Sequence, residues 1–250
     1  MDIREEYNRW LELNREHIDT PLPVSEIFGP TIQGEGNHAG RACYFIRLGG
    51  CNLSCEWCDT PYSTGTHGIP LSTIPKRTPR SITSAIPQNR LIILTGGEPL
   101  MHAKRPAFIA LLYLLKAKGC EIHVETNGTL SPGKTGELID HFTISPKIGV
   151  KMMNPKHESR ATPTDWENYK DKAILKTVWC DGDASTFCQE SIKLGERLGI
   201  PQKNVWVMPE GATEPELQKK WATLAQAAAD NNINATHRLH ALAWGDQKGH

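Results

Sequence analysis

The chain has 250 residues and carries 28 lysines and arginines against 28 aspartates and glutamates. That length suits one α/β domain, and the balanced charge argues against a broad nucleic-acid-binding surface. No apolar run approaches the roughly 20 residues of a membrane span, and the charged N-terminal segment lacks the apolar core of a signal peptide. We therefore expect a soluble cytoplasmic protein that binds neither membrane nor nucleic acid.

Short apolar segments rich in β-branched residues predict a series of strands. They are 43–48, 91–95, 121–126, 142–145, 173–179, 204–208 and 238–244. Helices are predicted from Pro106 to Lys118, from a cap at Asp183 to Leu198, and over 214–230. Alternating strands and helices imply parallel pairing, and so a barrel-like or doubly wound α/β fold. Residues 60–90 and 151–171 interrupt the alternation and are expected to form lids or binding loops.

We interpret residues 1–22 as an N-terminal extension and 23–250 as one domain. The extension is either a short helix packed on the outside or a mobile peripheral segment, and the sequence leaves both interpretations open.

Three of the seven cysteines, Cys51, Cys55 and Cys58, lie together directly after a predicted strand. In a reducing compartment such a cluster indicates metal or redox chemistry rather than disulfides. Three thiolates on a [4Fe–4S] cluster leave one iron open for a substrate or cofactor. The alternative is a structural zinc site, with His67 as its fourth ligand. The other cysteines lie in apolar segments and are interpreted as buried thiols.

Polar or glycine-rich groups follow five of the predicted strands. They lie at 47–51, 95–99, 125–128, 145–147 and 208–211. Because the carboxyl ends of parallel strands carry the reactive face in such folds, these groups are expected to surround one site. Gly96 and Gly97 would let the backbone approach a ligand closely, although a simple tight turn explains them equally well.

The C-x₃-C-x₂-C spacing after a strand resembles the radical S-adenosylmethionine (SAM) superfamily. The resemblance implies an incomplete TIM-like barrel with a trimmed core, and a [4Fe–4S] cluster whose open iron binds the methionine end of SAM. It further implies that one electron cleaves SAM to a 5′-deoxyadenosyl radical. The residues that it implies for SAM binding are Gly97, Glu98, Ser145, Pro146, Lys147, Val207, Met208, Pro209 and Glu210.

A narrower resemblance rests on residues 31–36, Gly40-Arg41, 45–47, the cysteine triad and Asp59-Thr60. From about residue 24 to Arg238-Leu239-His240 the chain is similar to the 7-carboxy-7-deazaguanine synthases. This family implies conversion of 6-carboxy-5,6,7,8-tetrahydropterin to 7-carboxy-7-deazaguanine, with loss of ammonia and regeneration of SAM, in the route to queuosine. It also implies Mg²⁺, held by Thr60 and the substrate carboxylate.

The substrate-binding residues implied by the resemblance are Ile32, Gln33, Gly34, Glu35, Arg47, Thr95 and His240. Arg47 offers a planar fork to a carboxylate, and Gln33 can pair with an amide-and-amine ring edge. Structural interpretations remain open: Arg47 paired with a protein carboxylate, a surface turn at 33–35, Thr60 as a turn cap and His240 as a core histidine.

A homodimer and an electron donor such as flavodoxin or ferredoxin are the partners that the family implies. Two other functions remain in competition: an activase of a glycyl-radical enzyme, and a zinc-stabilised module without catalysis. The C-terminal segment 244–250 takes no role from the resemblance.

Overall fold

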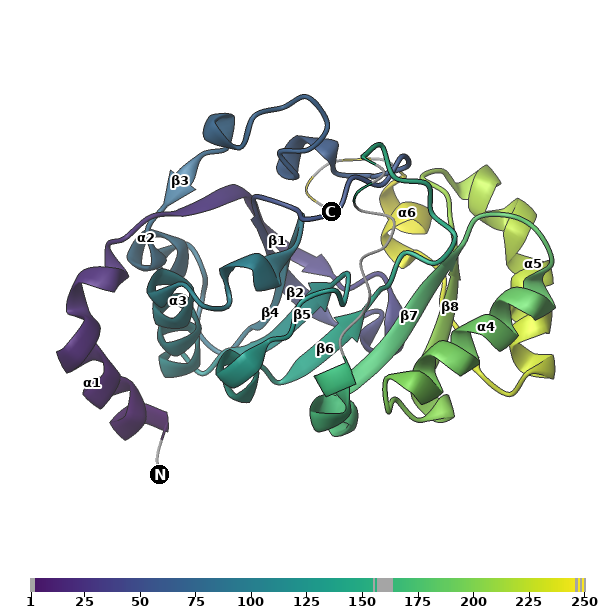
Figure 1. The fold of residues 1–250 in the computed structure, drawn as a ribbon. Coiled ribbons are helices and arrows are strands. Elements are labelled where there is room, and N and C mark those ends of the chain that lie inside the picture. The colour runs from purple at the N-terminus through teal and green to yellow at the C-terminus, as the bar shows by residue number, and fades with distance from the viewer. Residues whose placement is uncertain (1–2, 155, 157–163, 246, 248, 250) are drawn as a thin grey trace.

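A mixed β-sheet runs through the molecule, and its strands lie nearly in chain order (Figure 1). The computed structural model describes residues 3–154, 156, 164–245, 247 and 249. Across the sheet the order is β3-β1-β2-β4-β5-β6-β7-β8-β9. The strands are β1 (Leu22–Ile32), β2 (Ala42–Leu48), β3 (Lys76–Arg77), β4 (Leu91–Gly96), β5 (Glu121–Thr126), β6 (His141–Ile144), β7 (Ala173–Trp179), β8 (Val205–Pro209) and β9 (Asn234–Ala235).

Every pair from β2 to β9 is parallel, whereas β1 is antiparallel to both β2 and β3. The first and last strands in this order do not pair with each other, so the sheet stays open. This confirms the prediction of an incomplete α/β barrel, in which the carboxyl ends of the parallel strands share one face.

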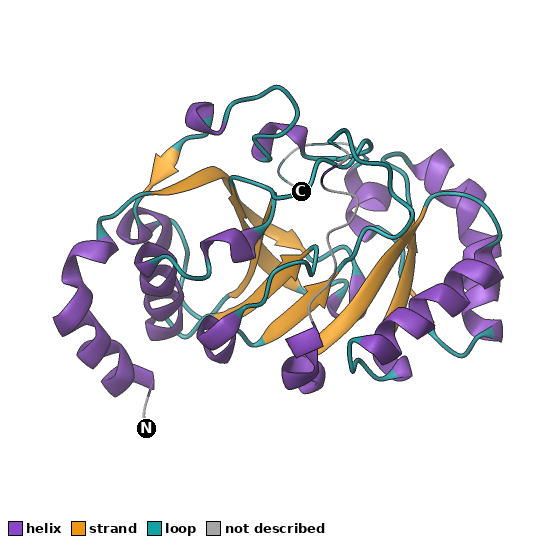
Figure 2. Cartoon of the chain, viewed as in Figure 1, coloured by secondary structure: helices purple, strands orange, loops and turns teal. Residues whose placement is uncertain are grey.

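The helices are α1 (Ile3–Asn14), α2 (Pro79–Ser84), α3 (Pro106–Ala117), α4 (Ala184–Arg197), α5 (Glu214–Asp230) and α6 (Leu239–Trp244). They flank the sheet, with α1 to α3 at the left and α4 and α5 at the right in Figure 2. The three longest predicted helices, α3, α4 and α5, are confirmed. Asp183 Oδ1 caps α4 by accepting from Thr186 N at 2.7 Å, as predicted.

The main core lies between the central strands and the helices that cover them. Ile92 of β4 and Ile122 of β5 are fully buried with Phe108 and Leu111 of α3. Strands covered on both faces read as continuous apolar runs, as 91–95 does, whereas 121–126 alternates polar and apolar residues.

The strand predicted at 238–244 is wrong, because Leu239–Trp244 forms α6. Leucine and alanine favour a helix there, and Leu239 N bonds to Gly34 O instead of to a sheet neighbour. Conversely, β1 was not predicted. Pro23 and Pro30 interrupt it, and its pairing with β2 contains two register shifts, so no regular alternation marks it in the sequence.

The N-terminal extension was interpreted either as a packed helix or as a mobile segment, and in the structure it contains the helix α1. Within α1, Tyr7 and Trp10 pack on Tyr113 of α3, with ring centroids 6.0 and 5.5 Å apart, and Glu6 accepts from the Tyr113 hydroxyl at 2.8 Å. The division into 1–22 and 23–250 stays a prediction. None of the described helices is long and apolar enough to span a membrane.

The structure describes all of residues 60–90 but only part of residues 151–171, the two stretches that interrupt the predicted alternation. Residues 60–90 hold only short elements: the 3-10 turns η3 (Pro61–Ser63) and η4 (Leu71–Thr73), β3 and α2. The expected loop at 151–171 falls partly outside the described residues, and the 3-10 segment η8 (Thr164–Lys172) covers its end.

Candidate active site

A cavity of about 350 Å³ opens at the carboxyl ends of the parallel strands. Its walls come from the ends of β4, β5, β6 and β8, together with the loop after β1. The lining includes Thr95, Gly96, Gly97, Thr126, Asn127, Ser145, Lys147, Met208, Pro209 and Glu210. The volume suits a small-molecule site. The structure therefore brings together the strand ends that the sequence marked as polar or glycine-rich.

The three cysteines lie in a loop directly beyond β2, beside this cavity. Backbone bonds from Gly50 N to Ser63 O at 2.7 Å and from Cys51 N to Thr64 O at 2.9 Å hold the start of the loop. The thiols gather with Leu53, Val150 and Met152 in a small apolar cluster. Burial raises the pKa of Cys51 to about 12 and raises the pKa of Cys55 and Cys58 as well. Metal binding there must therefore release protons.

This arrangement fits an iron–sulfur cluster better than a single zinc ion. Four thiolates around zinc, at about 2.3 Å each, would place the sulfurs within roughly 4 Å of one another. A cube instead spreads its thiolates over different irons. Among the described residues, no three His, Cys, Asp or Glu side chains are placed to hold one metal ion.

His67, the predicted fourth zinc ligand, is engaged elsewhere. Its Nε2 lies 2.9 Å from Cys55 O, and its Nδ1 lies 3.0 Å from Thr64 Oγ1 and 3.1 Å from Thr66 Oγ1. With both ring nitrogens bonded to protein, His67 supports the cysteine loop and has no nitrogen left for a metal.

The two glycines after β4 allow that strand end to touch the cysteine loop. A Cβ on Gly97 would lie 2.2 Å from Gly50 O, and a Cβ on Gly96 would lie 2.0 Å from Leu48 O. Gly96 also has φ +139°, which other residues rarely adopt. The expected close approach is therefore present, and its immediate partner in the structure is the backbone around Gly50.

Glu98 is fully buried, and both oxygens of its carboxylate accept hydrogen bonds from the protein. Oε1 accepts from Leu100 N at 2.9 Å and from Thr126 Oγ1 at 2.8 Å, and Oε2 accepts from Asn127 N at 2.7 Å. Burial raises its pKa to about 6 despite these donors. The carboxylate thus ties the end of β4 to the end of β5, and Glu98 does not line the cavity.

The other residues predicted for SAM fall into two groups. Ser145, Lys147, Met208, Pro209 and Glu210 line the cavity, whereas Pro146 and Val207 do not. Val207 belongs to the core between β8 and the helices. The Lys147 ammonium lies 5.5 Å from the Trp57 ring centroid, so it bridges the end of β6 and the cysteine loop.

Arg47 is paired with a protein carboxylate. Its Nε donates to Glu26 Oε1 at 2.6 Å, and the Tyr62 hydroxyl donates to the same oxygen at 2.7 Å. Within the part of the chain that the structure describes, the terminal guanidinium nitrogens of Arg47 make no hydrogen bond, and the residue lines the cavity. Arg47 is therefore paired with a structural carboxylate through Nε and still has its two terminal nitrogens available at the cavity.

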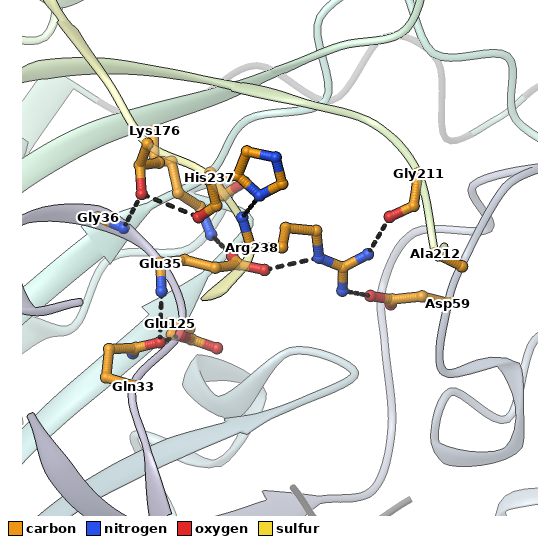
Figure 3. Close-up of polar contacts among 12 residues, drawn as sticks. Gln33, Glu35, Gly36, Asp59, Glu125, Lys176, Gly211, Ala212, His237 and Arg238 are labelled. Atoms are coloured by element: carbon orange, nitrogen blue, oxygen red, sulfur yellow. Dashed lines mark hydrogen bonds and ion pairs between the residues drawn. The ribbon is translucent and has the colours of Figure 1, made fainter. Parts of the chain in front are cut away.

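Buried charges form the floor of the cavity (Figure 3). Lys176 of β7 pairs with Glu35 Oε2, and Arg238 Nε donates to Glu35 Oε1 at 3.0 Å. Burial alone would raise the pKa of Glu35, but these two cations hold it well below its ordinary value. Gln33 donates to Glu125 Oε1 at 3.0 Å and accepts from Glu35 N at 3.2 Å. The predicted Gln-Gly-Glu segment is therefore part of a buried polar network, not a surface turn.

The remaining predicted residues also reach this region. Ile32, Thr95, Thr60 and His240 line the cavity. A Cβ on Gly34 would lie 1.9 Å from His240 Nδ1, so this glycine is what lets the ring pack on the loop after β1. Burial lowers the pKa of His240. Thr60 Oγ1 is 4.0 Å from Cys58 Sγ, and its hard oxygen beside Asp59 suits Mg²⁺.

Sequence reasoning missed Lys176 and gave Arg238 no role, although both line the cavity, whereas Glu125, which also lines it, belongs to the group 125–128 that was expected around the site. One signal was available. Lys176 is a single charge inside the apolar strand 173–179, and a buried charge requires a partner of opposite charge. Arg238 carried no comparable signal.

Comparisons with known proteins agree with this geometry. Residues 45–175 match the family model of the radical SAM superfamily. The 7-carboxy-7-deazaguanine synthase of Pyrobaculum aerophilum is 31% identical over 233 residues, covering 90% of this chain and 96% of that protein. The synthase of Bacillus subtilis is 30% identical over 244 residues, covering 91% and 98%.

A solved structure shares the fold. The crystal structure of QueE from Escherichia coli matches with a TM-score of 0.63 and 20% identity, covering 92% of this chain and 98% of that one. Because the sequence matches extend over nearly the whole length of both partners, the chain belongs to the radical SAM superfamily and, within it, to the 7-carboxy-7-deazaguanine synthase family.

Proposed function

We propose that this chain converts 6-carboxy-5,6,7,8-tetrahydropterin to 7-carboxy-7-deazaguanine and ammonia by a radical ring contraction. The observation that carries the proposal is the cavity itself: paired charges lie at its floor, the strand ends enclose it, and Arg238 of the floor bonds to Asp59 of the cysteine loop. The overall change removes ammonia without net oxidation, so it balances with SAM regenerated.

The side chains of the cavity fit the two ends of such a substrate. The free terminal nitrogens of Arg47 suit the carboxylate. At the floor, Gln33 and the anionic Glu35 suit the amide and amine edge of a pterin, because that edge offers both donors and acceptors. An enclosed, charged floor also favours a small molecule over the glycine segment of a partner protein.

The groups that the family uses have matching residues here. Cys51, Cys55 and Cys58 would hold the [4Fe–4S] cluster, Gly97 and the ends of β6 and β8 would hold SAM, and Thr60 would hold Mg²⁺. When bound, the cluster and SAM supply the radical that removes hydrogen from the substrate. The protein itself contributes position, exclusion of water and the charges of the floor.

Two partners belong to the proposal. An electron donor of the flavodoxin or ferredoxin class would reduce the cluster, and a homodimer would be the working assembly. Each is tested directly, the first by donor-dependent cleavage of SAM and the second by the mass of the reconstituted protein in solution.

The deciding experiment is anaerobic turnover with the carboxytetrahydropterin, SAM, Mg²⁺ and a chemical reductant. The wild-type protein is expected to form a deazapurine carboxylate, identified by mass and absorbance, and one SAM should support many turnovers. Cys58→Ala is the matched control, which should lose both the cluster and the product. Cleavage of SAM without any deazapurine would show that the substrate is wrong.

A further inference from the structure

The segment that carries Arg238 is fixed by two hydrogen bonds to the loop after β1. Thr236 Oγ1 accepts from Gly36 N at 2.9 Å, and Leu239 N donates to Gly34 O at 2.9 Å. These bonds do not involve the side chain of residue 238. A substitution of Arg238 therefore tests its guanidinium with the backbone path held in place.

The guanidinium joins three segments that are far apart in the sequence. Nε donates to Glu35 Oε1 at 3.0 Å, Nη1 donates to Gly211 O at 2.7 Å, and Nη2 donates to Asp59 Oδ2 at 3.3 Å. Figure 3 shows it lying between these three partners. Glu35 belongs to the Glu35 loop (33–36), Gly211 to the β8 loop (209–212) and Asp59 to the cysteine loop (51–60).

Only a guanidinium can serve all three partners at once. Its donors point in fixed directions within one plane, whereas a lysine is a single point charge on a flexible stem. Arg238 is 17% exposed and Glu35 is 13% exposed, so water screens their contact little. Lys176 already holds Glu35 Oε2, and hence Arg238 sets the direction of the other oxygen.

We propose that Arg238 is a positioning residue: it orients the Glu35 carboxylate toward the substrate and locks the cysteine loop and the β8 loop onto the Glu35 loop. The cavity is thus assembled around one side chain, which links the substrate end of the site to the cluster end. This inference rests on the proposed function for the identity of the substrate, whereas the locking of the loops does not depend on it.

The locking is tested by hydrogen exchange on the protein before it is loaded with iron. Arg238→Gln should accelerate exchange at least about fivefold in all three loops, because each loses a hydrogen bond. Asp59→Asn should accelerate exchange in the cysteine loop alone. The control is Arg80→Gln, which breaks an exposed pair with Asp19 and should leave all three loops unchanged. Equal exchange in wild type and Arg238→Gln would overturn the proposal.

The orientation of Glu35 is tested by kinetics on the reconstituted enzyme. Arg238→Gln should raise the substrate KM at least about tenfold while iron content and SAM affinity change less than about twofold. An unchanged KM, or a loss of iron equal to the loss of activity, would overturn the positioning role. If Arg238→Gln does not fold, Arg238→Lys replaces it and must show the same direction in exchange and KM.

Failure of the proposed function is distinguishable from failure of this inference. If wild-type protein forms no deazapurine but cleaves SAM, the substrate assignment fails while the exchange measurements still decide the locking. If wild-type protein is active and Arg238→Gln matches it in both KM and exchange, only the inference fails.

Discussion

Two buried histidines, in β5 and β6, and a half-buried one in the turn after β1 predict a loss of stability in mild acid. His38, His123 of β5 and His141 of β6 have ring centroids 4.5 to 4.9 Å apart. His141 is 7% exposed, and its Nε2 has no hydrogen-bond partner within the described residues. Burial and the neighbouring histidines lower its pKa to about 3, and burial lowers the pKa of His38 to about 4.

The charged groups around the trio are balanced. Arg41 donates to both oxygens of Glu121, at 2.9 and 2.6 Å, and Glu121 Oε1 lies 2.7 Å from His123 Nε2. Arg41 Nη1 lies 3.2 Å from His38 Nδ1. Glu121 is thus already occupied by a cation, which leaves no carboxylate to compensate a second positive charge on His141.

The sign and size of the change in the free energy of unfolding with pH follow from the linkage between proton binding and folding. A histidine with a lowered folded-state pKa binds fewer protons folded than unfolded, so its contribution is complete above pH 6.5 and is lost as pH falls toward 3. Between pH of about 7.5 and about 5, His141 alone should cost about 2 kcal/mol of the free energy of unfolding. That is a large share of the roughly 5–15 kcal/mol of a typical domain.

The assay is urea unfolding of the iron-free protein under reducing conditions at both pH values. His141→Phe keeps a planar ring and removes the titrating group, so its loss of stability in acid should be smaller than that of wild type by about 2 kcal/mol. The control, His17→Gln, changes a histidine outside the trio and should behave as wild type. If His141→Phe loses as much stability in acid as wild type, the reasoning about the buried neutral ring is refuted.

Three further predictions concern the site. Gly97→Ala should lower the iron retained after reconstitution, because the added carbon meets Gly50 O at 2.2 Å, and an iron content equal to that of wild type would contradict the reasoning. Arg47→Ala should raise the substrate KM at least about tenfold without loss of iron. It also leaves the Glu26 carboxylate without its partner, and the double variant Arg47→Ala/Glu26→Gln removes that charge. If the double variant restored the KM of wild type, the role of Arg47 would be structural. Lys176→Met should lower the free energy of unfolding by about 3 kcal/mol, measured in urea, because it breaks a buried ion pair. It should also raise the pKa of Glu35, because Lys176 is the first cation that holds it low, and an unchanged titration of the Glu35 carboxyl would contradict the pairing.

How much of the site was predictable depended on the strands. The parallel strands β4 and β6 to β8 read clearly because they are mostly buried, β5 alternates polar and apolar residues, and the ends of these strands marked most of the cavity wall. The partner of Arg47 was unreadable because Glu26 lies on β1, which prolines and register shifts disguise. Glu98 was expected at the ligand, but only the structure shows that Thr126 and Asn127 already occupy its oxygens.

The two ends of the cavity differ in how far stability and function can be separated. At the floor, Glu35 carries one negative charge between Lys176 and Arg238, so removing Glu35 leaves two cations without their carboxylate, whereas removing one cation leaves Glu35 paired with the other. A change there alters folding and binding together. Toward the rim, Glu26 already balances Arg47, and the free guanidinium nitrogens can take a substrate carboxylate without disturbing that pair. Specificity for the acid group should therefore be altered by changing Arg47 and Glu26 together, so that neither is left without its partner.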